Sequence, residues 1–134
     1  MVKLLKWSGG IGGGVVLAGL FWFGVREYRC HRRNAEFANR IAVIRQDAQA
    51  QLKIGTTKAD VARFYTAHQI PFEVVSLPHK DEGFEAIGTL YTTGGCAPVG
   101  CGTDDALIRV HVKVDATGTT IGEPEVVDMY TDCL

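Results

Sequence analysis

The chain has 134 residues, of which 46% are hydrophobic and 22% charged, a balance that excludes wholesale disorder. Its net charge of −1 hides an uneven distribution: residues 1–33 hold six basic side chains and one acidic one, whereas residues 34–134 hold eight basic and fourteen acidic ones. An acidic region of about 100 residues suffices for one modest core and repels phosphates, so we expect a single domain there and no nucleic-acid binding.

The first segment of note is an uncharged stretch of nineteen residues, 7–25. A helix of this length, at about 1.5 Å per residue, covers most of the ~30 Å apolar core of a bilayer, and a tryptophan lies near each end. We therefore predict an N-terminal transmembrane helix and juxtamembrane segment over residues 1–33. The predicted contacts with membrane lipid are distributed along the span at Trp7, Ile11, Val15, Leu20, Trp22 and Val25.

A cleaved signal peptide is the alternative interpretation of this segment. Lys3 and Lys6 suit the basic start of such a peptide. Residues 16–18 are a poor cleavage site, however, and cleavage there would leave an apolar new terminus that continues to Val25. An uncleaved anchor is therefore the favoured interpretation.

The orientation of the predicted anchor is contested. Two lysines precede the span and four arginines follow it, which favours a cytoplasmic C-terminal domain. The cysteines discussed below favour an oxidising compartment, and bulky domains translocate largely regardless of local charge. We expect an extracytoplasmic domain, with a cytoplasm-facing module as the alternative. Cys30, within the basic stretch 26–33, is expected as a free thiol, with acylation or an interchain bridge as alternatives.

Residues 34–70 predict two helices joined by a very short turn. In the first, apolar residues recur in steps of three and four, and Gly55 is expected to end the helix. Nothing in the sequence separates this helix from the preceding span, so the two can form one continuous helix. The residues of this apolar stripe are Phe37, Ile41, Ile44, Ala48 and Leu52. In the second, Thr57 is the expected N-cap with Asp60 three positions on, and Pro71 marks the end.

The remainder of the chain predicts antiparallel strands over residues 72–77, 84–93, 108–114 and 121–131. The third is the clearest, because apolar and polar residues alternate strictly from Ile108 to Val114. Residues 115–118 are typical of a hairpin turn, and Pro124 indicates an edge position or a bulge in the last strand. The predicted domain, residues 34–134, is an α+β fold with two helices on one face of a sheet of three to four strands.

The helix–turn–helix segment LKIGTTKADVARF, residues 52–64, resembles the BamE (SmpA)-like domain, which shows an apolar-x-x-Gly-x-Ser/Thr-x-x-Glu/Asp-Val pattern there. The hairpin from Val110 to Val127 is similar to the terminal hairpin of that family. The resemblance implies the fold shared with β-lactamase inhibitor protein and a role in binding envelope proteins without catalysis. The chain departs from the family in lacking the lipobox cysteine, and no binding residue is transferred.

Three cysteines are the disulfide candidates: Cys96, Cys101 and Cys133. If the hairpin at 115–118 pairs Val114 with Ile121 or a neighbour, Cys133 comes to lie beside residue 101 or 102. The three cysteines then gather at one end of the sheet. The pairs Cys101–Cys133, Cys96–Cys133 and Cys96–Cys101 all remain open, and any of them favours an oxidising compartment.

Two further interpretations of the cysteines compete with a disulfide. A zinc site lacks the usual ligand spacing and a nearby histidine. A thiol redox protein or thiol enzyme using Cys96 and Cys101 requires a lowered thiol pKa, which Asp104 and Asp105 oppose. No catalytic, cofactor or metal site is predicted. The sequence thus predicts a membrane-tethered, non-catalytic binding domain of the cell envelope with another envelope protein as partner, and a thiol redox protein as the alternative.

Overall fold

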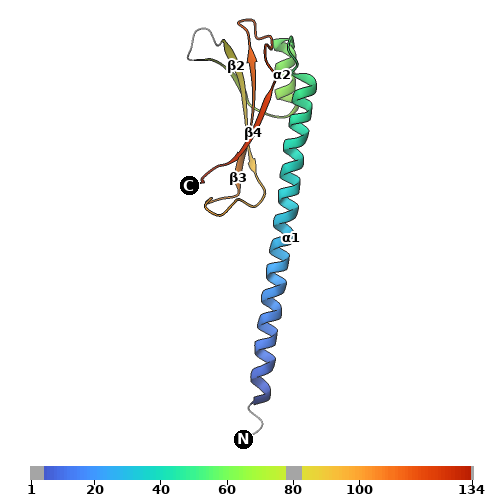
Figure 1. Ribbon diagram of the computed structural model, residues 1–134, viewed down its shortest axis with the longest axis vertical. Helices are drawn as coiled ribbons and strands as arrows, with labels where there is room; N and C mark the ends of the chain where they lie inside the picture. Colours follow the sequence, from blue (N-terminus) through green and yellow to red (C-terminus); the bar gives the residue numbers. More distant parts are fainter. Residues whose placement is uncertain (1–4, 78–82, 134) are drawn as a thin grey trace.

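The computed structural model describes residues 5–77 and 83–133, with the side chains of the first helix described from Gly14 onward. Its elements are α1 (Leu5–Gln51), α2 (Lys58–Ala67), β1 (Phe72–Ser76), β2 (Phe84–Thr93), β3 (Asp105–Val114) and β4 (Glu125–Tyr130). The strands form one antiparallel sheet in the order β1-β2-β3-β4, and both helices lie on the same side of it (Figure 1). Two helices on a four-stranded antiparallel sheet agree with the predicted α+β domain.

Helix α1 is unbroken over 47 residues and passes through the predicted boundary at residue 33. Its C-terminal half packs on the sheet, while its N-terminal half extends beyond the rest of the molecule (Figure 1). The predicted apolar stripe is confirmed, because its members are all buried: Phe37, Ile41, Ile44, Ala48 and Leu52. The segment predicted as an anchor and the first helix of the domain are therefore one element.

The predicted transmembrane helix is wrong. In the part of the chain whose side chains are described, no helix contains an apolar stretch long enough to cross a bilayer. The uncharged part of that region is residues 14–25, twelve residues that rise only about 18 Å against a bilayer core of about 30 Å. Charged side chains follow at once at Arg26, Glu27 and Arg29. The predicted single-pass membrane localisation is contradicted for the same reason.

The turn between the helices forms where the sequence predicts it. Gly55 has a φ of +90°, a left-handed conformation that glycine adopts without strain. Thr57 is the N-cap of α2, and its hydroxyl accepts a hydrogen bond from the Asp60 backbone N–H at 3.3 Å. Helix α2 ends at Ala67, earlier than Pro71 requires, because Gln69 adopts a left-handed φ of +55° and its backbone N–H bonds to the Thr66 carbonyl in a tighter turn.

The strands pair as a simple meander in which each is antiparallel to the next. The alternation in β3 is confirmed, since Ile108, Val110, Val112 and Val114 are all buried. Gly118 supplies the positive φ of the β3–β4 turn, at +84°. Strand β4 starts only after Pro124 and lies at the sheet edge, as the proline indicates.

One hydrophobic core lies between the helices and the sheet. Tyr65 of α2 is fully buried in it, and its hydroxyl donates to the carbonyls of Ala86 or Val110, at 3.1 and 3.2 Å. Burial raises the pKa of this phenol well above its ordinary value, so the hydroxyl remains a neutral donor. The buried hydroxyl of Thr120 accepts from the Thr56 backbone N–H at 2.8 Å and joins the interhelical turn to the β3–β4 hairpin.

Candidate functional site

The cysteines form two disulfides at one end of the sheet. Cys101 and Cys133, 32 residues apart, lie opposite each other in an antiparallel bridge and are bonded. The predicted register, which places Cys133 beside residue 101, is confirmed. Cys96 is bonded to Cys30 of α1, 66 residues earlier, and not to either of the other two candidates.

Cys30 is therefore not the free thiol that we expected. The expectation separated residues 1–33 from the domain, whereas the unbroken α1 brings Cys30 alongside the β2–β3 loop. A signal for this was present in the sequence: Cys30 lies seven residues, two helical turns, before Phe37. It thus continues the buried stripe of α1 by one further position on the same face.

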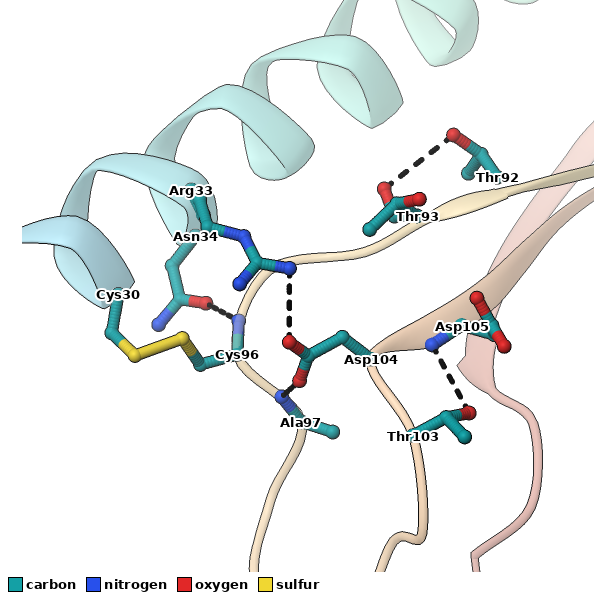
Figure 2. Close-up of polar contacts among 10 residues, drawn as sticks. All are labelled: Cys30, Arg33, Asn34, Thr92, Thr93, Cys96, Ala97, Thr103, Asp104 and Asp105. Atoms are coloured by element: carbon teal, nitrogen blue, oxygen red, sulfur yellow. Dashed lines mark hydrogen bonds and ion pairs between the residues drawn. A yellow bond between two sulfur atoms is a disulfide. The ribbon is translucent and has the colours of Figure 1, made fainter. Parts of the chain in front are cut away.

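Polar contacts reinforce the junction between α1 and the β2–β3 loop, as Figure 2 shows. The side-chain oxygen of Asn34 accepts from the Cys96 backbone N–H at 2.7 Å. Arg33 forms an ion pair with Asp104 at 2.9 Å, and the Ala97 backbone N–H donates to the same carboxylate at 2.8 Å. That backbone hydrogen bond, followed by the charge of Arg33, lowers the pKa of Asp104, so the ion pair persists at neutral pH.

The remaining interpretations of the cysteines find no matching geometry. All four cysteines are in disulfides, and Cys96 and Cys101 belong to different ones. Among the described residues there is also no group of three or more side chains able to hold a metal ion. In this structure the two disulfides instead join α1 and the segment after β4 to the β2–β3 loop.

The residues predicted to contact lipid are not gathered into a site. Trp7 and Ile11 have side chains outside the described part of the chain. Val15, Leu20 and Trp22 are 67%, 65% and 72% exposed on the projecting half of α1. Val25, the last of the predicted set, is half-buried where α1 meets the β2–β3 loop.

The two edges of the sheet differ in how they are covered. At β4, α1 packs along the edge: Arg45 donates to the carbonyl of Val126 at 3.3 Å, and the Phe37 and Tyr130 rings lie 6.0 Å apart. At β1, hydrogen bonds from Thr89 to the Pro71 carbonyl and from Leu77 to the Gly83 carbonyl fix the ladder. Because antiparallel pairs alternate, the outward groups of β1 belong to residues 72, 74 and 76.

The outward backbone groups of β1 are available for pairing. The three N–H and three C=O groups of Phe72, Val74 and Ser76 have no hydrogen-bond partner within the described residues. Phe72 and Val74 also leave 37% and 47% of their surface exposed at this edge. On the other face of β1 lies the exposed Glu73, while Glu85 lies one strand inward on β2, with its carboxylate 3.4 Å from the His111 Nδ1. The β1 edge therefore combines free backbone groups, apolar surface and negative charge.

Comparisons with family models, with curated proteins and with solved structures find no match to this chain. The resemblance to the BamE-like domain thus stays a prediction. The sequence did not identify the β1 edge, because a sequence does not reveal which strand lies at an uncovered edge.

Proposed function

We propose that this chain is a non-catalytic binding domain of the cell envelope that holds an extended segment of a partner protein along the edge of β1. The observation that supports this is that six outward backbone groups of β1 have no partner in the described chain, whereas α1 packs along β4 and its Arg45 binds the Val126 carbonyl there. An open edge of this kind binds extended peptides by adding a strand.

The side chains at the edge indicate the chemistry of the partner. In an added strand, alternate residues point to the helix side, where Phe72 and Val74 offer apolar surface. The intervening residues point to the opposite face, beside the exposed Glu73 of β1. We therefore expect a segment in which apolar residues alternate with lysine or arginine. The excess of acids in residues 34–134 attracts such a segment from a distance.

Two observations support an oxidising setting for this activity. Both disulfides join segments distant in the sequence, and such bonds persist outside the reducing cytosol. The architecture of two helices on one side of an antiparallel sheet is also what the resemblance to the BamE-like domain implies. That family binds proteins in cell envelopes.

A displayed library of random eight-residue peptides, selected against the full disulfide-bonded chain, tests the proposal. We expect selected peptides to alternate apolar and basic residues. Val74→Pro removes an outward N–H without removing a bond to β2, so it is expected to weaken binding at least about tenfold while the domain stays folded. Val74→Ala is the matched control, because it shortens the side chain but keeps the N–H group.

The proposal fails if the selected peptides bind the Val74→Pro chain as tightly as the unchanged chain. It also fails if the peptides show neither the alternation nor the basic residues. Circular dichroism of each variant verifies that a loss of binding is not a loss of folding.

A further inference from the structure

A second site lies where α1 leaves the sheet, and it shares no residue with the β1 edge. A hollow of about 490 Å³, within the size range of small-ligand sites, lies between α1 and the β2–β3 loop. The loop residues that line it are Cys96, Ala97 and Asp104. The α1 residues that line it include three apolar and three basic side chains: Phe21, Trp22, Val25, Arg26, Arg29 and Arg33.

The helix orders these side chains by chemistry. Phe21, Val25, Arg29 and Arg33 are four residues apart and share one face, with the apolar pair toward the N-terminus and the arginines toward the loop. The hollow therefore has an apolar end and a basic end. A ligand that satisfies both ends is an amphiphile.

The charges at the basic end are not balanced. Arg33 is paired with Asp104, but neither Arg26 nor Arg29 has an ion-pair partner within the described chain. Arginine binds carboxylate and phosphate groups through a planar fork of N–H donors. The unpaired guanidinium groups thus indicate an anionic head group.

The walls of the hollow are held in place before any ligand binds. The Cys30–Cys96 disulfide joins two residues that line it, and the Asn34 and Arg33 contacts fix the loop against α1 (Figure 2). A Cβ at Gly95 would lie 2.8 Å from the Asn34 Cα, so glycine allows the loop its close approach to the helix. The backbone on both sides of the hollow therefore needs no reordering on binding, whereas the exposed side chains of Phe21 and Trp22 lose freedom when a ligand binds.

We propose that this hollow binds one molecule of an amphiphile with a carboxylate or phosphate head group. The head group lies between Arg26 and Arg29, and the apolar chain lies against Phe21, Trp22 and Val25. This assignment does not depend on the proposed strand addition at β1.

Trp22 fluorescence tests the proposal in the full chain with Trp7→Phe, which leaves Trp22 as the only tryptophan. The probe is dodecyl phosphate, kept below the concentration at which it aggregates. We expect a saturable change in Trp22 emission with one site per chain. Arg26→Gln combined with Arg29→Gln is expected to weaken the apparent affinity at least about tenfold.

The matched control is Lys58→Gln combined with Arg63→Gln, which removes two positive charges from exposed positions of α2. It is expected to leave the affinity unchanged, and equal weakening by both pairs would overturn the proposal. An equal affinity for neutral dodecyl maltoside would show that the arginines do not select the ligand. An equal affinity for inorganic phosphate would show that the apolar end is not used. A response seen only after the probe aggregates would exclude a one-molecule site.

Discussion

Gly88 lies on β2 directly under the ring of Tyr65. A Cβ at this position would come within 2.6 Å of the Tyr65 Cδ1 atom and 2.7 Å of the Ile70 Cγ2 atom. Because Tyr65 is fully buried and its hydroxyl is hydrogen-bonded, the ring has no room to move. The absence of a side chain at Gly88 thus sets the distance between α2 and the sheet.

We predict that Gly88→Ala lowers the free energy of unfolding by about 1–3 kcal/mol through overpacking. Urea denaturation followed by circular dichroism measures this change. Gly24→Ala is the control: nothing lies within 4 Å of that Cβ position on α1, so no loss is expected there. An unchanged midpoint for Gly88→Ala would contradict the packing described.

Thr120 is the buried polar residue that joins the interhelical turn to the hairpin. Its hydroxyl accepts from the Thr56 N–H and donates to the carbonyl of Lys53. Thr120→Val keeps the shape but leaves these groups without their partner, so we predict a loss of about 1–3 kcal/mol in the same denaturation assay. Thr120→Ser restores the hydroxyl and should recover most of that loss. Equal stability of the valine and serine variants would argue against the hydrogen bonds.

Asp115 makes the stability of the hairpin depend on pH. Hydrogen bonds from the Thr117 side chain, and then from the Thr119 backbone, lower the pKa of its carboxyl below the ordinary 3.8. The carboxylate therefore stabilises the fold above pH ~4, and this contribution is lost as the pH falls through the lowered pKa. We predict that the stability difference between the unchanged chain and Asp115→Ala shrinks from pH 7 to pH 3. A constant difference in urea midpoint would contradict this.

Strand β1 shows how the position of a strand in the sheet decides which of its backbone N–H groups are protected from hydrogen exchange. The N–H groups of residues 73 and 75 point to β2, whereas those of residues 72, 74 and 76 point away from it. We predict alternating hydrogen exchange along β1, fast at Phe72, Val74 and Ser76 and slower at Glu73 and Val75. Residue-resolved NMR measures this pattern. Uniform protection along the strand would mean that the edge is covered.

The apolar stripe of α1 shows what periodicity predicts at the scale of an element and what it leaves open. Its spacing of three and four identified the buried face from Phe37 to Leu52, because only one face of a helix can contact the sheet. Periodicity did not show where the helix begins. The uncharged residues 7–25, which precede the stripe, are numerous enough for a membrane span. Those among them whose side chains are described, residues 14–25, are too few to cross a bilayer.

At the scale of the whole molecule, the two disulfides join the middle of α1 and the segment after β4 to the β2–β3 loop. Cys30–Cys96 spans 66 residues and Cys101–Cys133 spans 32, so both restrict the unfolded chain. We predict that Cys30→Ser combined with Cys96→Ser lowers the unfolding free energy by about 2–4 kcal/mol. Guanidinium denaturation under non-reducing conditions measures the loss.

The same double variant is expected to expose α1 between residues 26 and 33 to limited proteolysis, because the junction with the loop is released. Cys101→Ser combined with Cys133→Ser is the control, since it leaves α1 attached. If both double variants are cleaved alike in that segment, the junction does not depend on the Cys30–Cys96 bond.

Several features of the fold were determined by the sequence alone. The strict alternation in β3, the glycine turns at residues 55 and 118 and the Thr57 cap each result from interactions between near neighbours in the chain. The hairpin register also predicted the proximity of Cys101 and Cys133, because a strand pair joined by a short turn brings positions equidistant from that turn together.

Only the tertiary structure decided which cysteine joins Cys96, which edge of the sheet is open, and where Arg26 and Arg29 lie relative to the β2–β3 loop. These features depend on the path of one continuous helix past the sheet. Local propensities do not specify that path, because it is set by the packing of residues far apart in the chain.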